Sequence, residues 1–214
     1  KGQLRVLPKA EILGRLYSCG FRLLEYTENE CLLTFVAQKI KLPDYNTNPS
    51  FGPIFKMKRM GKNGMIIHVY KLRTMHAYSE YLQSYINETN GLAVGGKFKN
   101  DFRISSYGRF FRKFWIDELP MLINFIRGDI KLFGVRPISK HYFNLYSEEL
   151  KQLRIMHKPG LIPPFYVDLP KTLEEIIDSE LRYLNAYEKS PILTDIRYFV
   201  MVFYTIVIRR ARSN

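Results

Sequence analysis

A turn sequence between two strand-like runs is the feature that most constrains the fold. The runs IFKMKRM and MIIHVYKLR flank residues 61–64, which read Gly-Lys-Asn-Gly. Asn-Gly between such runs is the strongest short-range signal for a β-hairpin, because both residues tolerate the positive φ angles of a tight turn. The sequence therefore predicts a small β-hairpin here.

The residues before this hairpin predict a small α/β cap. Lys9–Cys19 reads as a helix that stops at Cys19-Gly20-Phe21, and strands follow at Phe21–Tyr26 and in the run CLLTFVAQKI. Pro43–Pro53 is dense in Pro, Asn and Gly and is the best linker candidate. We therefore predict two domains: residues 1–50, a cap or the tail of an upstream domain with its linker, and residues 51–214, a catalytic domain.

The second half of the chain predicts mostly helices. The run SYGRFFRKFWIDELPMLINFIRG suggests two short helices, with Asp117 as N-cap of the second and Gly128 at its end. Residues 76–96 read as helix and then loop, and Pro159–Pro170 reads as an irregular loop. Thr172 and Glu175 form a capping box that opens a helix, and a terminal helix follows Pro191. The expected fold class is α+β: a helix-rich single catalytic domain with a small hairpin, plus the N-terminal cap and membrane-associated surface helices.

The charge balance points to an anionic partner. The chain of 214 residues carries 33 Lys and Arg against 20 acids, a net charge of +13. Such a balance suits nucleic acid, an anionic membrane surface or a phosphorylated substrate, and does not choose among them. Two cysteines and four scattered histidines give little support to a disulfide framework or to zinc. The chain begins at Lys1, so it could be a fragment of a longer protein.

The run YFVMVFYTIVI, residues 198–208, is the most apolar segment. As a helix it is roughly 17 Å long, too short to cross a bilayer. Its basic flanks and aromatic residues suit a helix lying in the membrane interface, and a C-terminal core helix is the equal alternative.

Basic segments lead towards an adjacent acid pair, Asp117 and Glu118. Residues 51–75 hold six Lys and Arg and no acid, and residues 97–113 hold six against one acid. A carboxylate among fixed positive charges stays ionised near neutral pH and can act as a nucleophile or metal ligand. Carboxylates, Mg²⁺ and basic side chains recur in phosphoryl transfer. From spacing alone, however, Asp117 as a helix cap and solvated basic faces are the commoner interpretations.

Three strings in order carry a resemblance to a known family: KMKRMGKNGMIIHVYKLRTM, then KFKNDFRISSYGRFFRKFWIDELPMLINFIRGDIKLFGVRP, then MHKPG. They resemble the bacterial sugar transferases, monotopic phosphoglycosyltransferases that start exopolysaccharide, O-antigen or glycan synthesis. The resemblance runs from Phe51 to the C-terminus and leaves residues 1–50 uncovered.

The resemblance implies a two-step transfer of sugar-1-phosphate from a UDP-sugar to polyprenyl (undecaprenyl) phosphate. Asp117 matches the nucleophile that attacks the β-phosphate, releases UMP and forms a covalent intermediate. Glu118 matches its partner, as Mg²⁺ ligand or as acid/base, and both acids are expected near the metal. The family works at the cytoplasmic face of the bacterial inner membrane.

Further residues match the family's substrate- and phosphate-binding positions. They are Lys71, Arg73, Arg112, Arg136, Pro137 and the DxR element Asp101 and Arg103, for which structural pairing is an equal alternative. Two departures stand out. Val135 replaces a proline in the family's GPRP motif, and LIPPFYVDLP follows Pro159-Gly160 where many members continue Thr-Gly.

The family's apolar re-entrant helix upstream of the hairpin has no counterpart in residues 1–50. Either an anchor lies further upstream or surface helices serve instead, with the C-terminal helix and Phe110, Phe111, Phe114 and Trp115 as the membrane contact.

Two other readings stay open. A nucleic-acid-binding protein fits the charge but leaves the DELP and KLRTM strings unexplained, so we expect no nucleic-acid partner. A catalytically silent relative acting as an assembly scaffold is the alternative function, although the intact acid pair argues against it. A homo-oligomer is compatible with the sequence, which does not decide it.

Overall fold

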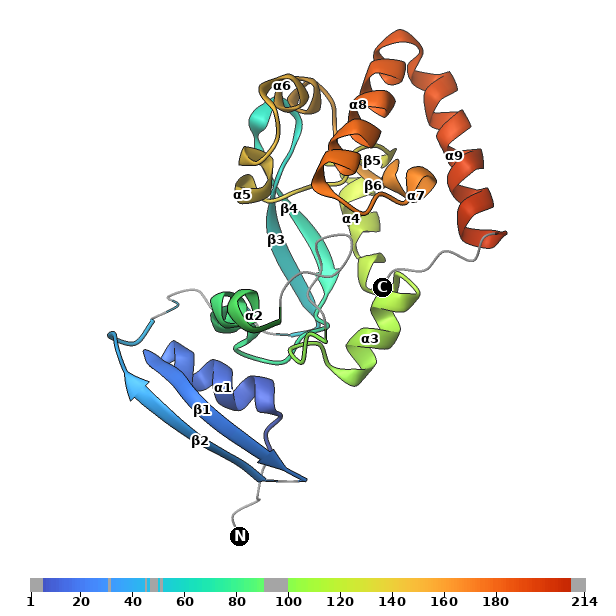
Figure 1. The fold of residues 1–214 in the computed structure, drawn as a ribbon. Helices are drawn as coiled ribbons and strands as arrows, with labels where there is room; N and C mark the ends of the chain where they lie inside the picture. The colour runs from blue at the N-terminus through green and yellow to red at the C-terminus, as the bar shows by residue number, and fades with distance from the viewer. Residues whose placement is uncertain are drawn as a thin grey trace. The chain divides into compact units, whose positions relative to one another are not determined.

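The computed structural model describes residues 6–30, 32–44, 46, 50, 52–90 and 100–208. It mixes helices with small sheets, and the described residues form three two-stranded sheets (Figure 1), which confirms the coarse α+β prediction. The chain divides into two compact units. The first comprises Lys1–Ser50, Thr74–Ala93 and Lys97–Arg109, and the second comprises Phe51–Arg73, Val94–Gly96 and Phe110–Asn214. The predicted cap is thus built together with segments that follow the hairpin, and its separate role stays a prediction.

The first unit is built on an antiparallel hairpin of two strands, β1 (Phe21–Asn29) and β2 (Leu32–Lys39). Helix α1 (Lys9–Ser18) covers one face of this hairpin (Figure 1). Gly20 ends α1 as predicted, because its φ of 83° turns the chain into β1.

A short 3₁₀ helix, η2 (Ser79–Leu82), and α2 (Gln83–Asn90) complete this unit. Its core joins Leu13 of α1 and Leu23 of β1 to Leu82 and Ile86. The end of the segment predicted as helix and then loop, residues 91–96, lies outside the described residues, and so does part of the predicted linker.

The second unit contains the predicted hairpin. Strands β3 (Ile54–Met60) and β4 (Ile66–Leu72) pair antiparallel along their whole length. The turn includes a 3₁₀ segment, η1 (Lys62–Gly64), in which Asn63 and Gly64 have φ of 57° and 71°. The Asn-Gly signal therefore located the turn correctly.

Two helices predicted around the acid pair are present, but the cap assignment is wrong. Helix α3 is Ser106–Lys113, and α4 is Met121–Ile126. Asp117 lies inside a 3₁₀ turn, η3 (Ile116–Glu118), and the residue before α4 is Pro120. Trp115, with a left-handed φ of 56°, begins η3, and this local turn removes Asp117 from the cap position. Gly128 follows α4 with a φ of 77°, as predicted for a helix stop.

The segment predicted as an irregular loop contains two elements. Strand β6 (Gly160–Ile162) pairs in parallel with β5 (Lys131–Phe133), and α7 (Phe165–Asp168) follows. The parallel partner of β6 lies about 30 residues away and leaves no signature in the local sequence. The prolines of this segment therefore predicted a loop where a strand is present.

The remaining helices enclose the main core of this unit. They are α5 (Lys140–Asn144), α6 (Glu148–Met156), α8 (Leu173–Lys189) and α9 (Pro191–Val207). Thr172 caps α8 as predicted, since its side chain accepts a hydrogen bond from the Glu175 N–H at 3.2 Å. Val135, Leu150 and Leu184 are among the buried residues at the centre.

Helix α9 packs beside α8 (Figure 1). It exposes most of its apolar side chains. Its buried residues are Thr194, Val202 and Thr205, whereas Phe203 is 59% exposed and Ile192 is 78% exposed. The core-helix alternative is therefore wrong. None of the helices in the described ranges has the length and apolar character needed to cross a membrane.

The contact between β5 and β6 admits no side chain at Gly160. A Cβ there would lie 2.2 Å from the Gly134 nitrogen and 2.6 Å from the Phe133 carbonyl carbon, both backbone atoms that cannot rotate away. We expect Gly160→Ala to lower the free energy of unfolding by about 3 kcal/mol, the upper end of overpacking effects. Chemical denaturation measures it, with the exposed neighbour Lys158→Ala as control. An unchanged unfolding midpoint in Gly160→Ala would contradict this packing.

Candidate functional site

Three residues predicted for the site meet in the second unit. Lys71 of β4 donates a short hydrogen bond to Glu118 Oε1, and Arg136 Nη2 lies 3.1 Å from the same oxygen. Glu118 belongs to η3 and Arg136 to the turn after β5. The fold thus brings three distant parts of the sequence to one carboxylate.

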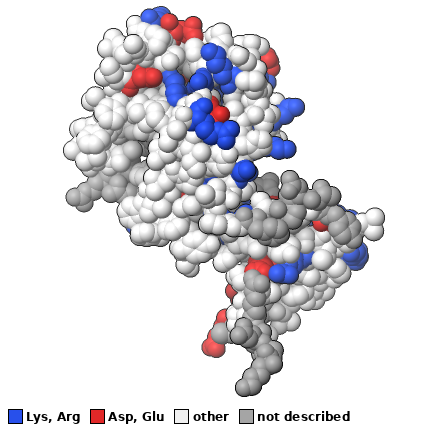
Figure 2. Space-filling view, turned by 180° about the vertical axis from the view of Figure 1, so that it is seen from behind, with Lys and Arg blue, Asp and Glu red and all other residues white. Residues whose placement is uncertain are grey.

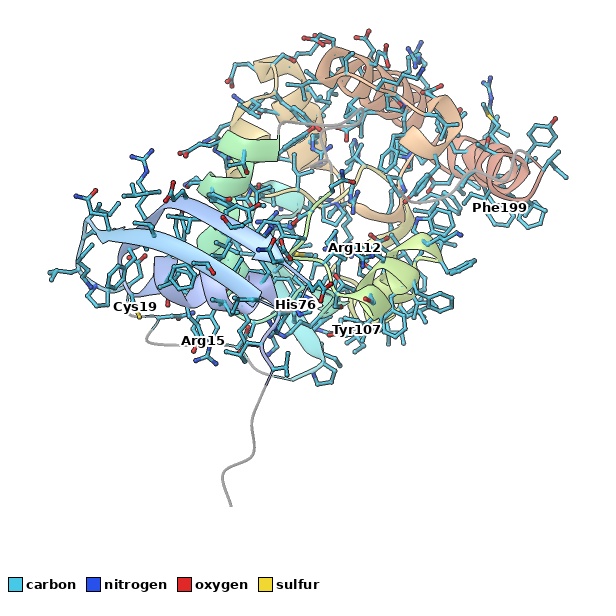
Figure 3. All side chains as sticks on the ribbon, turned by 60° about the horizontal axis from the view of Figure 1, so that its bottom comes forward. Arg15, Cys19, His76, Tyr107, Arg112 and Phe199 are labelled. Carbon is cyan, nitrogen blue, oxygen red and sulfur yellow. The ribbon has the colours of Figure 1, made fainter. Side chains whose placement is uncertain are left out.

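Asp117 is buried beside Glu118, with 8% of its surface exposed. Burial raises the pKa of the Asp117 carboxyl, and the positive charges of Lys71 and Arg112 oppose that rise. The basic neighbours alone predict a shift in the other direction, but desolvation outweighs them. Arg112, on α3 and labelled in Figure 3, is thereby placed within electrostatic reach of Asp117.

The cations of the site also act on one another. Burial lowers the pKa of the Lys71 ammonium, and the nearby Arg136 lowers it further while Glu118 opposes the change. Burial and then Arg136 likewise lower the pKa of Arg59, on β3. In the upper part of Figure 2, several Lys and Arg side chains gather around an acidic one. Such a concentration of like charge favours the binding of an anion with several negative charges.

The other predicted residues occupy different positions. Arg73 donates from Nε to the Gly52 carbonyl at 3.0 Å, and its guanidinium lies 5.6 Å from the centre of the Phe55 ring. It therefore borders the start of β3. Pro137 is buried directly after Arg136 and completes the turn.

Asp101 and Arg103 lie in the first unit as a buried ion pair. Arg103 donates from Nε and Nη2 to the two carboxylate oxygens of Asp101 at 2.8 and 2.7 Å, and from Nη1 to Gln83. Their side chains are only 3% and 6% exposed. This geometry fits the structural-pairing alternative for the DxR element.

Sequence reasoning missed Asn124, which fastens α4 to β4. Its amide oxygen accepts from the Tyr70 N–H at 2.9 Å, and its amide nitrogen donates to the His68 carbonyl at 2.7 Å. The completely buried amide thus satisfies two backbone groups of β4, as a neighbouring strand would, next to Lys71. A single amide inside the apolar run MLINFI was the available signal.

Arg154, on α6, was also missed. Its guanidinium donates to the Arg136 carbonyl at 2.5 Å and forms a buried ion pair with Glu180 of α8. Both partners are less than 5% exposed, so neither charge is solvated by water. The pair therefore holds the backbone of the turn that presents Arg136.

The acid pair has the donor chemistry that Mg²⁺ requires. In the described part of the chain, no three His, Cys, Asp or Glu side chains come together as a complete metal cage. Mg²⁺, however, commonly binds through one or two carboxylates and completes its shell with water and substrate phosphates. Asp117 and Glu118 fit that mode of binding.

Comparison with known proteins extends this description. The model of a family described as bacterial sugar transferase matches residues 27–209, so the match begins earlier than the motifs beyond Phe51 suggested. The galactosyl transferase CpsE of Streptococcus agalactiae is 30% identical over 73% of this chain and 35% of its own length.

Two further relatives are named for polyprenyl-linked reactions. The undecaprenyl-phosphate galactose phosphotransferase of Salmonella typhimurium is 34% identical over 55% of this chain and 26% of its own length. A UDP-glucose:undecaprenyl-phosphate glucose-1-phosphate transferase of Caulobacter vibrioides is 35% identical over 61% of this chain and 44% of its own. The chain therefore spans less than half the length of these three relatives.

Replacing Asn124 tests the support of the site. We expect Asn124→Ala to leave the Tyr70 N–H and His68 carbonyl without their partner and to lower the free energy of unfolding by about 1–3 kcal/mol per unsatisfied group. Denaturant unfolding measures the loss. Asn144→Ala, an exposed amide on α5, is the matched control and should change stability by less than about 0.5 kcal/mol. Equal stability of the two variants would show that Asn124 does not fasten the helix.

Proposed function

The chain belongs to the bacterial sugar transferase family, and we propose from this premise that it transfers sugar-1-phosphate from a UDP-sugar to undecaprenyl phosphate. UMP is the other product of the first step. The names of the relatives from Salmonella typhimurium and Caulobacter vibrioides support this donor and acceptor chemistry. One relative, from Sinorhizobium fredii, is named exopolysaccharide production protein ExoY, and this name supports surface polysaccharide synthesis as the pathway.

The observation that carries the proposal is the ion-paired Glu118 beside the buried Asp117. An Asp117 oxygen attacks the β-phosphorus of the donor and forms a new P–O bond. The bond between that phosphorus and the bridging oxygen breaks, and UMP leaves with the electron pair. The aspartyl phosphosugar is then attacked by the phosphate of the lipid, which restores the Asp117 carboxylate.

The neighbouring residues have separate tasks in this scheme. Lys71, Arg112 and Arg136 supply positive charge against the phosphate oxygens, as in other phosphoryl transfers. Glu118 serves as metal ligand or as acid/base for the lipid phosphate. Asp117 and Glu118 would hold Mg²⁺, and the ion would supply positive charge against the donor diphosphate.

Asp117→Asn tests the nucleophile. The amide is a poor nucleophile of nearly the same size, so we expect UMP release to fall by at least a thousandfold, while the fold is kept. The assay measures UMP formed from UDP-glucose or UDP-galactose with Mg²⁺ and undecaprenyl phosphate in detergent. Asp178→Asn, an exposed acid on α8, is the control and should retain full activity. Full turnover by Asp117→Asn would remove Asp117 from the role proposed for it.

The lipid acceptor requires contact with a membrane, and we propose that exposed apolar side chains of the second unit provide it. Phe110 of α3 and Phe114, directly after it, are 55% and 44% exposed, and Ile126 of α4 is 83% exposed. Figure 3 labels Phe199 of α9, which lies on the same exposed helix face as Val200 and Phe203. Aromatic and aliphatic groups of this kind favour the interface of a bilayer, and the net charge of +13 favours anionic headgroups. The cytoplasmic face of the inner membrane, where UDP-sugars are found, is the proposed location.

Vesicle sedimentation tests this contact. We expect the protein to bind vesicles containing anionic phosphatidylglycerol, and the double variant Val200→Ser/Phe203→Ser to bind them at least tenfold more weakly, because it exposes polar groups to the acyl region. The double variant Leu145→Ser/Met156→Ser changes two exposed apolar residues, one directly after α5 and one at the end of α6, and should bind like the unchanged protein. If both double variants bind vesicles equally weakly, the binding depends on the overall exposed apolar surface and not on a contact made by α9.

A further inference from the structure

Helix α7 places a tyrosine beside the acid pair. The Trp115 indole Nε1–H donates to the Tyr166 hydroxyl oxygen at 2.5 Å, and the two rings meet edge to face at a centroid distance of 5.6 Å. Trp115 is the residue that begins η3, two positions before Asp117. A chain segment distant in sequence is therefore fixed to the turn that carries the proposed nucleophile.

The Tyr166 hydroxyl retains a hydrogen to donate. Its oxygen already accepts from Trp115, and within the described ranges no protein group accepts its own O–H. Burial raises the pKa of Tyr166 to about 12, with a further rise from the negative charge of Glu118 and an opposing effect of Arg136. The group consequently stays protonated at neutral pH, and it lies within electrostatic range of both Glu118 and Arg136.

Phe165 extends the same aromatic surface towards Arg136. Its ring lies 5.9 Å from the Arg136 guanidinium carbon and 4.4 Å from the Tyr166 ring, centre to centre. Near the acid pair there are thus a cation, Arg136, and a neutral hydroxyl donor, Tyr166. The Phe165 ring lies close to both of them. A neutral donor against an aromatic face is suited to oxygens of a sugar, whose hydroxyl groups alternate with apolar C–H groups.

We propose that Tyr166 binds the phosphosugar half of the donor, donating its O–H to an oxygen of that group, and that Trp115 is the positioning residue for this hydrogen bond. The inference rests on the proposed function. In that reaction the β-phosphorus must lie against Asp117, so the sugar attached to it is the part of the donor that reaches the neighbouring side chains. UMP, the leaving half, need not contact Tyr166.

The protein itself supplies the probe, because Trp115 is its single tryptophan. Intrinsic fluorescence of the full chain in detergent is titrated with UDP-glucose and UDP-galactose, in the Asp117→Asn background that binds donor without turnover. We expect Tyr166→Phe to raise the dissociation constant of the donor about tenfold and to leave that of UMP within twofold. Only titration midpoints are compared, since loss of the hydrogen bond to Trp115 changes the starting fluorescence. Tyr187→Phe removes one hydroxyl from the same unit and should leave both constants unchanged.

The possible results separate the inference from the function on which it rests. A donor dissociation constant in Tyr166→Phe equal to that of the parent overturns the inference, and so does equal weakening for donor and UMP. Failure of the protein with native Asp117 to release UMP overturns the proposed function, whether or not donor binding depends on Tyr166. Absence of any saturable fluorescence change with either donor overturns the inference alone, because UMP release by the protein with native Asp117 still decides the proposed function. Because phenylalanine keeps the ring and its packing, matching thermal melting curves will show that the variant is folded.

Discussion

The second unit depends on one carboxylate shared by two cations. Glu118 accepts from Lys71 and Arg136, and these three residues come from a strand, a 3₁₀ turn and the loop after β5. The carboxylate is mostly shielded from water, so its charge requires partners, and the removal of either cation leaves a costly imbalance. The need to pair this carboxylate therefore assembles the site, and Asp117, the residue directly before Glu118, is carried into it.

Buried polar groups behind the site meet the same requirement. Asn124 completes the edge of β4, and the Arg154–Glu180 pair holds the carbonyl of Arg136. Among the described residues that are not exposed, every fully buried side-chain nitrogen and oxygen has a hydrogen-bond partner. Such networks have one satisfied arrangement and many unsatisfied ones, so they fix orientation more than they add stability. A nucleophile that must meet a phosphorus atom in line benefits from that fixed orientation.

The sequence predicted those features whose causes are local. The Asn63-Gly64 turn, the Gly20 helix stop and the Thr172 cap each depend on neighbouring residues, and all three are present. The cap role of Asp117 was wrong because the left-handed Trp115 precedes a separate turn, and the Trp115 side chain has its hydrogen-bond partner on α7, about 50 residues away in the sequence. Strand β6 was missed for the same reason, since its partner is β5. The motifs identified Lys71, Glu118 and Arg136, but nothing in the sequence indicates that these residues converge in space. Asn124 and Arg154 bind backbone N–H and carbonyl groups, which every residue type carries, so the sequence does not reveal these contacts.

The proposed covalent step gives one cluster of cations two uses. A direct transfer would require the donor diphosphate and the lipid phosphate to be bound together, with their negative charges opposed inside a small site. A covalent intermediate separates the two in time: UMP leaves before the lipid phosphate attacks, so Lys71, Arg112 and Arg136 can act on each phosphate in turn. The burial that raises the pKa of Asp117 fits this division of labour, because a poorly solvated carboxylate is a stronger nucleophile when the nearby cations and the substrate keep it ionised. The chain's surplus of positive charge then serves both proposed half-reactions, and the membrane contact proposed for the exposed apolar face of α9 serves the second alone.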